Sequence, residues 1–207
     1  MNIIYLKDEN SIADFAYQWT EEKIAEFGAT SLYIPAGKTP VQLYLLFEKL
    51  RPSWLENKKL IQVDDILDGA EKGKFNKFFA EILKGYYKNI IIPSLHQPHQ
   101  ADLSILGLGP NGHIAFHEPH LPDNFEYGEV KLAAQTIKDL ALADDTKGIT
   151  YGVKMLLDTK AILLIIVGNS KKRILQNLKK GLKSPASLLL KHQDLTIICE
   201  ESLNIRS

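Results

Sequence analysis

A glycine-rich segment at residues 107–119 carries the side chains with the clearest potential for catalysis. Its sequence is GLGPNGHIAFHEP, and it follows the apolar run 102–107 directly. His113 and Glu118 lie close together on it, and an imidazole oriented by a carboxylate is an acid/base device. Asn111 is near enough in sequence to orient the imidazole as well, so the segment offers two partners for His113. We therefore predict proton-transfer chemistry here.

The glycines of this segment have the spacing of a dinucleotide-binding fingerprint, Gly107-x-Gly109-x-x-Gly112. That fingerprint opens a full helix and has an acidic residue about 20 positions further on, at the end of the next strand. Pro119 cuts any helix short here, and the acidic residues about 20 positions further on, Glu126 and Glu129, lie in an expected loop. We therefore expect the glycines, Gly109 among them, to bring the backbone close to a small substrate.

Two carboxylates, Asp64 and Asp65, stand at the end of the apolar run 60–63. A carboxylate at the end of a buried strand can face a cleft, and partial desolvation can raise its pKa enough for it to act as a general base. The alternative is that one aspartate caps the next turn and the other is solvated. The residues alone leave both interpretations open.

Two turns have the composition of anion sites. The first, PAGKTP at 35–40, combines small residues, whose N–H groups can point at an anion, with the donors Lys38 and Thr39. It is not a nucleotide P-loop, because the glycine that this motif needs five residues before its Gly-Lys pair is missing. The second is VGNSKK at 167–172, where Lys171 begins a predicted helix. The helix dipole disfavours a cation there unless an anion is bound. The alternative for both turns is a solvated lysine.

Two histidines, His113 and His117, have the i,i+4 spacing of a zinc pair. No third ligand stands at a familiar spacing, and Pro119 and Pro122 interrupt the segment. We therefore expect no metal ion.

Apolar runs alternate with helix-like stretches along the chain. The runs are 31–35, 60–64, 102–107, 161–167 and 195–199. The helix-like stretches are 10–27, 40–50, 74–84, 147–157 and 170–181. Gly28 and Gly181 are the expected stops, Thr39 is the expected N-cap of the second helix, and 118–130 is expected to be a loop.

Several runs are apolar at consecutive positions, as in strands covered on both faces. We therefore predict an α/β fold, a single domain over residues 1–207 with a mostly parallel, Rossmann-like sheet and helices on both faces. Ligands bind such sheets at the carboxyl ends of the strands. All four motifs follow a predicted strand, so we expect them there.

Composition excludes several classes of protein. Lys plus Arg number 25 and Asp plus Glu number 25, so no basic field favours nucleic acid or an anionic membrane. The longest apolar run, 161–167, is far shorter than the about 20 residues of a membrane-spanning helix. The start lacks the basic stretch of a signal peptide, and the single cysteine, Cys199, excludes an internal disulfide. We expect a cytoplasmic protein that acts on a small molecule, as a monomer or a small homo-oligomer.

Together the motifs resemble the glucosamine-6-phosphate deaminase/6-phosphogluconolactonase family. The resembling stretches, in the family's order, are 34–40 (IPAGKTP), 63–65 (VDD), 106–119, 149–158 (ITYGVKMLLD) and 184–187 (SPAS). The most specific is GPNGHIAFHEP, which is more similar to the deaminase branch, because the lactonase branch usually lacks the Glu-Pro after the histidine.

The resemblance implies a role for each motif. Asp64 matches the base that moves a proton between C2 and C1 of the sugar, and His113, with Glu118 and Asn111 as partners, matches the acid/base of ring opening. The implied contacts to substrate and phosphate are Ala36, Gly37, Lys38, Thr39, Lys171, Asp65 and Gly109. No metal or organic cofactor is implied, since an aldose–ketose shift only relays protons.

The leading hypothesis is a glucosamine-6-phosphate isomerase/deaminase that releases fructose 6-phosphate and ammonia. The alternative is a 6-phosphogluconolactonase, because Lys38 stands where deaminases usually have a second glycine. A third is a sugar-phosphate-binding protein without turnover. This hypothesis rests on a missing residue. Most deaminases use an arginine to hold the phosphate, and residues 121–148 contain none.

Overall fold

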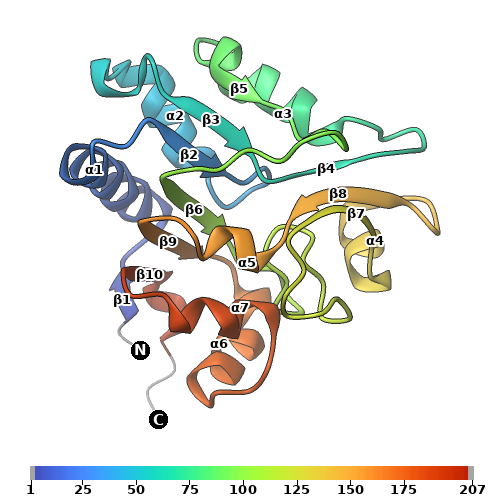
Figure 1. Cartoon of the computed structure of the whole chain (residues 1–207). Coiled ribbons are helices and arrows are strands. Elements are labelled where there is room, and N and C mark those ends of the chain that lie inside the picture. Colours follow the sequence, from blue (N-terminus) through green and yellow to red (C-terminus); the bar gives the residue numbers. More distant parts are fainter. Residues whose placement is uncertain (1–2, 205–207) are drawn as a thin grey trace.

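The computed structural model describes residues 3–204, and its core is a seven-stranded sheet with every strand parallel to its neighbours (Figure 1). The strand order is β1-β10-β9-β6-β2-β3-β5. The bounds are β1 (Ile3–Leu6), β2 (Ser31–Ile34), β3 (Lys59–Gln62), β5 (Ile90–Ile91), β6 (Leu103–Gly107), β9 (Ala161–Ile166) and β10 (Leu195–Glu200). The strands that precede the predicted motifs, β9, β6, β2 and β3, are neighbours, so their carboxyl ends share one edge of the sheet.

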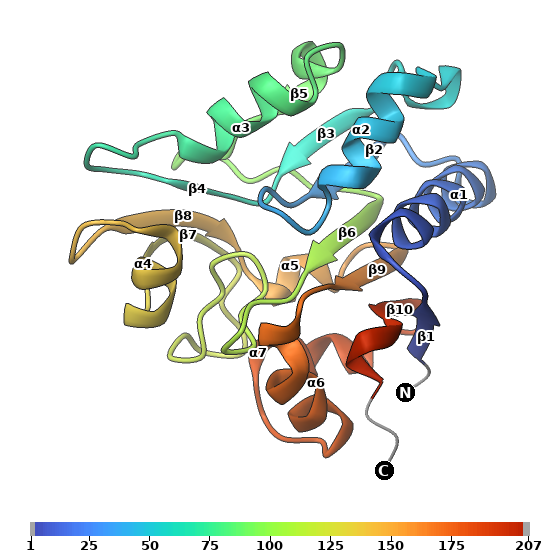
Figure 2. The same cartoon turned by 180° about the vertical axis from the view of Figure 1, so that it is seen from behind.

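Helices cover both faces of this sheet, which is why its strands are apolar at consecutive positions. The helices on one face are α1 (Glu9–Phe27), α2 (Val41–Leu50) and α3 (Lys74–Ile82), and those on the other are α5 (Val153–Leu156), α6 (Lys172–Lys179) and α7 (Pro185–Leu188). Strand β9 is buried throughout: Leu163 packs toward the first group and Leu164 toward the second. Figure 2 shows α1 and α2 on the side of the sheet nearer the viewer. The predicted α/β architecture is confirmed.

A second, antiparallel sheet lies beside the carboxyl edge of the first. It consists of β4 (Asp64–Ile66), β8 (Lys147–Tyr151) and β7 (Tyr127–Lys131), in the order β4-β8-β7, and α4 (Ala134–Leu140) follows β7 (Figure 1). Asp64 pairs with Thr150 in the register of this sheet. The sheet therefore links the end of β3 to the segments that surround the glycine-rich motif. Short 3-10 turns span Ser53–Leu55, Tyr87–Asn89, Asn169–Lys171, Leu189–Lys191 and Glu201–Leu203.

Most predicted elements are confirmed. The five apolar runs form β2, β3, β6, β9 and β10. Helix α1 ends at Gly28, which has the left-handed φ of 58° that glycine adopts without strain. The last predicted helix ends near Gly181, whose φ is +69°. Among the described residues, no helix has the length and apolar character needed to cross a bilayer.

Three local predictions are wrong. The predicted helix 147–157 is a strand over its first five residues, because pairing with β4 and β7 buries that segment and overrides a weak local preference. Thr39 does not cap α2, which begins at Val41 after Pro40 without a side-chain hydrogen bond. The predicted loop 118–130 ends early, since β7 begins at Tyr127.

Candidate active site

The end of β6 lies where the strand order of the sheet reverses. The chain runs outward from β2 to β3 and β5, then returns to β6 on the other side of β2. Such a switch point opens a crevice at the carboxyl ends of the strands. The PAGKTP turn borders it, because a Cβ at Gly107 would lie 3.7 Å from the Thr39 side chain. Thr39 therefore lies against the end of β6, while Lys38 is exposed beside it.

His113, Glu118 and Asn111 form one hydrogen-bonded cluster after β6. The Asn111 amide donates to Glu118 Oε2 at 2.9 Å, and its Oδ1 accepts from the backbone N–H of His113 at 3.0 Å. His113 Nδ1 lies 3.4 Å from Glu118 Oε2. The Glu118 side chain is 0 % exposed and that of His113 is 18 % exposed. Glu118 is thus the partner of the imidazole ring, and Asn111 holds the carboxylate and the backbone of His113.

Thr136, which the sequence did not predict, joins this cluster from α4. Its hydroxyl donates to Glu118 Oε1 at 2.5 Å and lies 3.3 Å from His113 Nδ1. The backbone N–H of Ala133 also points at Glu118 Oε1, at 3.3 Å. No local pattern marks Thr136, because it lies in a stretch with no predicted element and its partners are far away in sequence.

These contacts keep Glu118 ionised. Burial acts to raise its pKa, but neighbouring His113 and the hydrogen bonds from Thr136 and Asn111 more than offset it and hold the pKa at about 2. A carboxylate in this state stabilises positive charge on His113 when the imidazole takes up a proton.

Thr136 also determines which nitrogen of His113 carries the proton. Its single hydroxyl proton is directed at Glu118, so its oxygen can only accept from the imidazole. The network therefore assigns the proton to Nδ1 and leaves Nε2 as an acceptor. Nε2 lies over Gly109, where a Cβ would come within 2.2 Å of it. The imidazole ring of His113 can therefore occupy this place only because residue 109 is a glycine, which has no Cβ.

Asp64 is a second buried carboxylate at the same edge. It is 6 % exposed, and within residues 3–204 its carboxylate has no hydrogen-bond or ion-pair partner. Burial raises its pKa well above the ordinary value, and the charges of Asp65 and Glu118 act in the same direction. A carboxylate with a raised pKa is chemically able to act as a general base.

Asp65 points elsewhere and caps α3. Its Oδ1 accepts from the N–H groups of Ile66 at 2.8 Å and Phe75 at 2.9 Å, and its Oδ2 accepts from Asn76 N–H at 3.2 Å. The capping alternative thus describes Asp65, whereas the unpartnered carboxylate is that of Asp64. The predicted contact of Asp65 with substrate finds no support in this geometry, because the backbone occupies its carboxylate.

Lys171 ends the 3-10 turn after β9 and is half-buried. Within the described chain it has no carboxylate within ion-pair distance. Burial lowers the pKa of its ammonium group, and the charge of Asp139 on α4 opposes this change. A half-buried cation without a direct partner at a strand end suits an anionic ligand. The missing arginine has no evident replacement on the α4 side, since Lys138 is exposed there.

His117 does not pair with His113. Its Nδ1 accepts from the N–H of Val153 at 2.9 Å, at the start of α5, and its side chain is buried. The segment is not helical here, because Ala115 has a φ of +50°, so the i,i+4 spacing does not bring the two rings together. No group of three or more His, Cys, Asp or Glu residues among positions 3–204 is arranged to hold a metal ion.

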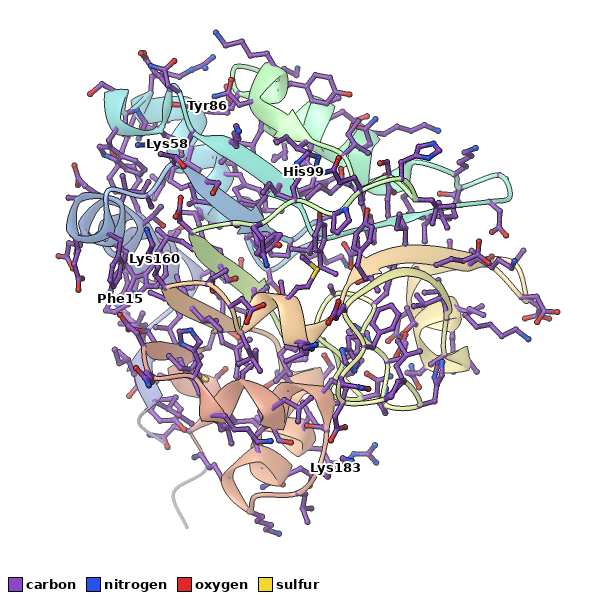
Figure 3. All side chains as sticks on the ribbon, viewed as in Figure 1. Phe15, Lys58, Tyr86, His99, Lys160 and Lys183 are labelled. Atoms are coloured by element: carbon purple, nitrogen blue, oxygen red, sulfur yellow. The ribbon has the colours of Figure 1, made fainter. Side chains whose placement is uncertain are left out.

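The segment before β6 has a different, structural function. His99, labelled in Figure 3, is fixed through its backbone: its carbonyl accepts from Tyr33 Oη at 2.5 Å, and its N–H donates to Tyr151 Oη at 2.9 Å. An open cavity of about 390 Å³ nearby is bordered by Tyr127 and Lys154. Its lining includes none of the residues of the His113 cluster.

Fold and site together define a class: an α/β protein with an acid/base cluster and a separate buried carboxylate at the switch point of a parallel sheet. A family described as glucosamine-6-phosphate isomerases/6-phosphogluconolactonase matches residues 74–198, more than half of the chain. The chain belongs to this family.

Individual relatives agree with this assignment. The chain is similar to glucosamine-6-phosphate deaminases of Bacillus thuringiensis and Bacillus anthracis, at 26 % identity over 97 % of this chain and 87 % of each relative.

Solved structures share the fold. A monomeric glucosamine-6-phosphate deaminase superimposes with a TM-score of 0.81 at 24 % identity, covering 98 % of both chains. A 6-phosphogluconolactonase from Trypanosoma cruzi gives a TM-score of 0.76 at 14 % identity, covering 98 % of this chain and 95 % of that one. Both branches of the family thus have this architecture.

Proposed function

We propose that this chain is a glucosamine-6-phosphate isomerase/deaminase, which converts glucosamine 6-phosphate and water into fructose 6-phosphate and ammonia. The observation that carries the proposal is that two buried carboxylates differ in their partners and in their ionisation. Glu118 is ionised and bound to the imidazole, whereas the Asp64 carboxylate has no partner among residues 3–204. Ring opening followed by proton transfer between two carbons needs an acid/base group and a separate base. The deaminase names of the relatives support the same choice.

Ring opening is the task of His113 in this proposal. Nε2 accepts the proton of the sugar's anomeric hydroxyl while Glu118 stabilises the imidazolium through Nδ1–H. The C1–O5 bond breaks, and the imidazolium returns the proton to the ring oxygen. The products are the open-chain aldehyde and the neutral imidazole, ready for another cycle.

Asp64 then moves a proton along the chain of the sugar. Its carboxylate takes the proton from C2 while O1 takes a proton from the amino group, which gives an enolamine with a hydroxyl at C1. Asp64 then delivers its proton to C1, which gives an imine at C2. Water adds to the imine, and ammonia leaves. A raised pKa makes the Asp64 carboxylate a stronger base than an exposed aspartate, and the nearby ammonium of the amino sugar favours its ionised form.

The phosphate is assigned to the other two strand ends. Lys171 supplies a half-buried cation, and the turn of Ala36, Gly37, Lys38 and Thr39 supplies N–H groups and two side-chain donors.

The second candidate is 6-phosphogluconolactonase. It is favoured by one observation, the exposed Lys38 in the turn that borders the crevice. In this alternative His113 activates water for lactone hydrolysis, and Asp64 has no proton to move between carbons.

The test follows the C2 proton of glucosamine 6-phosphate in deuterated water by NMR. The wild-type chain should remove the C2 proton and place at C1 of the product either that proton or the solvent deuterium that replaces it on Asp64. Asp64→Asn should abolish this transfer while leaving ligand binding nearly intact. Unchanged transfer in Asp64→Asn would overturn the assignment of the base. Product formation from 6-phosphogluconolactone, but not from glucosamine 6-phosphate, would favour the second candidate.

A further inference from the structure

Helix α4 packs on the rest of the molecule in an unusual way. Thr136 is its only fully buried residue, whereas Ile137 and Leu140 are partly buried. A surface helix normally buries a stripe of apolar side chains. In α4 the most deeply buried side chain is the polar Thr136, and its hydroxyl donates a hydrogen bond to the carboxylate of Glu118. The packing of this helix is therefore tied to the acid/base cluster.

The contacts of Glu118 divide into two pairs. Oε2 contacts Asn111 and His113, which belong to the same loop as Glu118. Oε1 contacts Thr136 and the N–H of Ala133, both from the segment that begins α4. One whole oxygen of a completely buried carboxylate thus depends on α4. Without these donors that oxygen would be buried and unpaired, which favours the protonated acid.

We propose that Thr136 is a positioning residue that keeps Glu118 ionised and His113 in its Nδ1–H tautomer, so that the acid/base pair is competent only when α4 is seated. The kinetic consequence rests on the proposed function, but the structural claim does not, because it concerns the chain without substrate. His113 is the titratable group in contact with this carboxylate, and the charges of Asp64 on β4 and of His117 also interact with it.

The experiment compares Thr136→Val, which keeps the shape of the side chain but removes the hydroxyl, with Thr136→Ser, which retains it. Thr20→Val is the matched control. Thr20 is also buried, but its hydroxyl bonds only to the carbonyl of Ala16, on α1. The carboxyl carbon of Glu118 is titrated by NMR without ligand and identified by its loss in Glu118→Gln. The imidazole nitrogens of His113 are observed in the same samples.

In Thr136→Val we expect the titration midpoint of Glu118 to rise by about one pH unit or more, since a hydrogen bond to a charged group is lost. The ring nitrogens of His113 should show a larger share of the Nε2–H form. With glucosamine 6-phosphate, kcat on the plateau of the pH profile should fall about tenfold, while the acid limb, which Asp64 sets through its higher pKa, should stay in place. Thr136→Ser should restore all three readouts, and Thr20→Val should lower the melting temperature without moving them.

A folded Thr136→Val protein with the wild-type titration of Glu118 would overturn the proposal. If valine prevents folding, Thr136→Ala removes the same hydroxyl with no added bulk, and the same criterion applies. A wild-type chain that releases no ammonia, combined with a shifted Glu118 midpoint in Thr136→Val, would refute the proposed function and leave this inference standing.

Discussion

Two adjacent aspartates in the sequence have opposite energetic roles. The carboxylate of Asp65 is satisfied by three backbone N–H groups, whereas that of Asp64 is buried without a partner. A buried carboxylate without a partner costs stability, and the protein keeps it at the edge of the sheet where chemistry is expected. The same substitution at the two positions should therefore have opposite effects on stability.

Asp64→Asn should stabilise the fold at neutral pH by about 1–2 kcal/mol and abolish turnover. Because the pKa of Asp64 is raised in the folded state, ionisation of this residue lowers the free energy of unfolding. The loss begins as pH exceeds the ordinary value of 3.8 and grows as pH approaches the folded pKa. Asp65→Asn should instead destabilise the fold by about 1–2 kcal/mol, because an amide has one acceptor oxygen for the three donors. Thermal unfolding between pH 4 and 8 measures both. Destabilisation by Asp64→Asn at pH 7 would contradict the unpartnered state of this carboxylate.

Lys171→Ala should raise the KM for phosphorylated ligands about 10- to 100-fold, as expected for the loss of a charged contact to phosphate. Binding of the same sugars without phosphate should hardly change. The control is Lys180→Ala, which removes an exposed lysine at the other end of α6. Equal weakening of both ligand types would show that the anion site lies elsewhere.

The sequence predicts those elements whose signal lies within one continuous stretch of residues. The apolar runs before Asp64, Gly107 and Val167 are continuous in sequence, so the strand ends and the motifs after them could be found without the structure. Strand β8 could not, because the strands that pair with it lie far away along the chain. The same holds for His117, whose partner Val153 is 36 residues away, and for the threonine of α4.

The turn after β6 makes its own prediction through Gly109. A methyl group at this position would lie 2.1 Å from His113 Cδ2, so Gly109→Ala must displace the ring. We expect kcat to fall at least about tenfold, since small misplacements of catalytic groups are costly. The fold should also lose about 1–3 kcal/mol of stability, because the displaced ring no longer partners the buried carboxylate of Glu118. Wild-type kcat in a folded Gly109→Ala protein would show that the ring position is not needed.

Across the whole molecule, one edge of the central sheet carries the candidate site and the other edge is stabilised by polar contacts. The carboxyl edge carries the site with its unpartnered charges. The amino edge is fastened by Asp102, whose carboxylate accepts from Thr30 N–H at 2.8 Å and Ser31 Oγ at 3.1 Å and pairs with Lys160 Nζ at 3.0 Å. This residue ties the starts of β2, β6 and β9 together, the three strands around the switch point.

Asp102→Asn should cost about 2 kcal/mol at neutral pH and leave kcat unchanged. Burial opposes ionisation, but the contacts to Thr30, Ser31 and Lys160 lower the pKa of Asp102 from 3.8 to about 2. Its stabilisation is therefore complete above the ordinary value and is lost as pH falls through about 2. Denaturant unfolding at pH 7 and pH 2 measures the difference between wild type and variant, which should shrink in acid. A constant difference would contradict the ionic role of Asp102.

We expect this fold to carry out ring opening and proton transfer on a phosphorylated amino sugar, and a paired assay with two substrates decides whether it does. Purified wild-type and Glu118→Gln proteins receive glucosamine 6-phosphate, with ammonia measured, and 6-phosphogluconolactone, with acid release measured above the spontaneous rate. We expect the wild type to release ammonia, Glu118→Gln to release it at least about 100-fold more slowly, and neither protein to release acid above background. Acid release without ammonia, silence with both substrates, or ammonia release that does not need Glu118 would contradict this expectation.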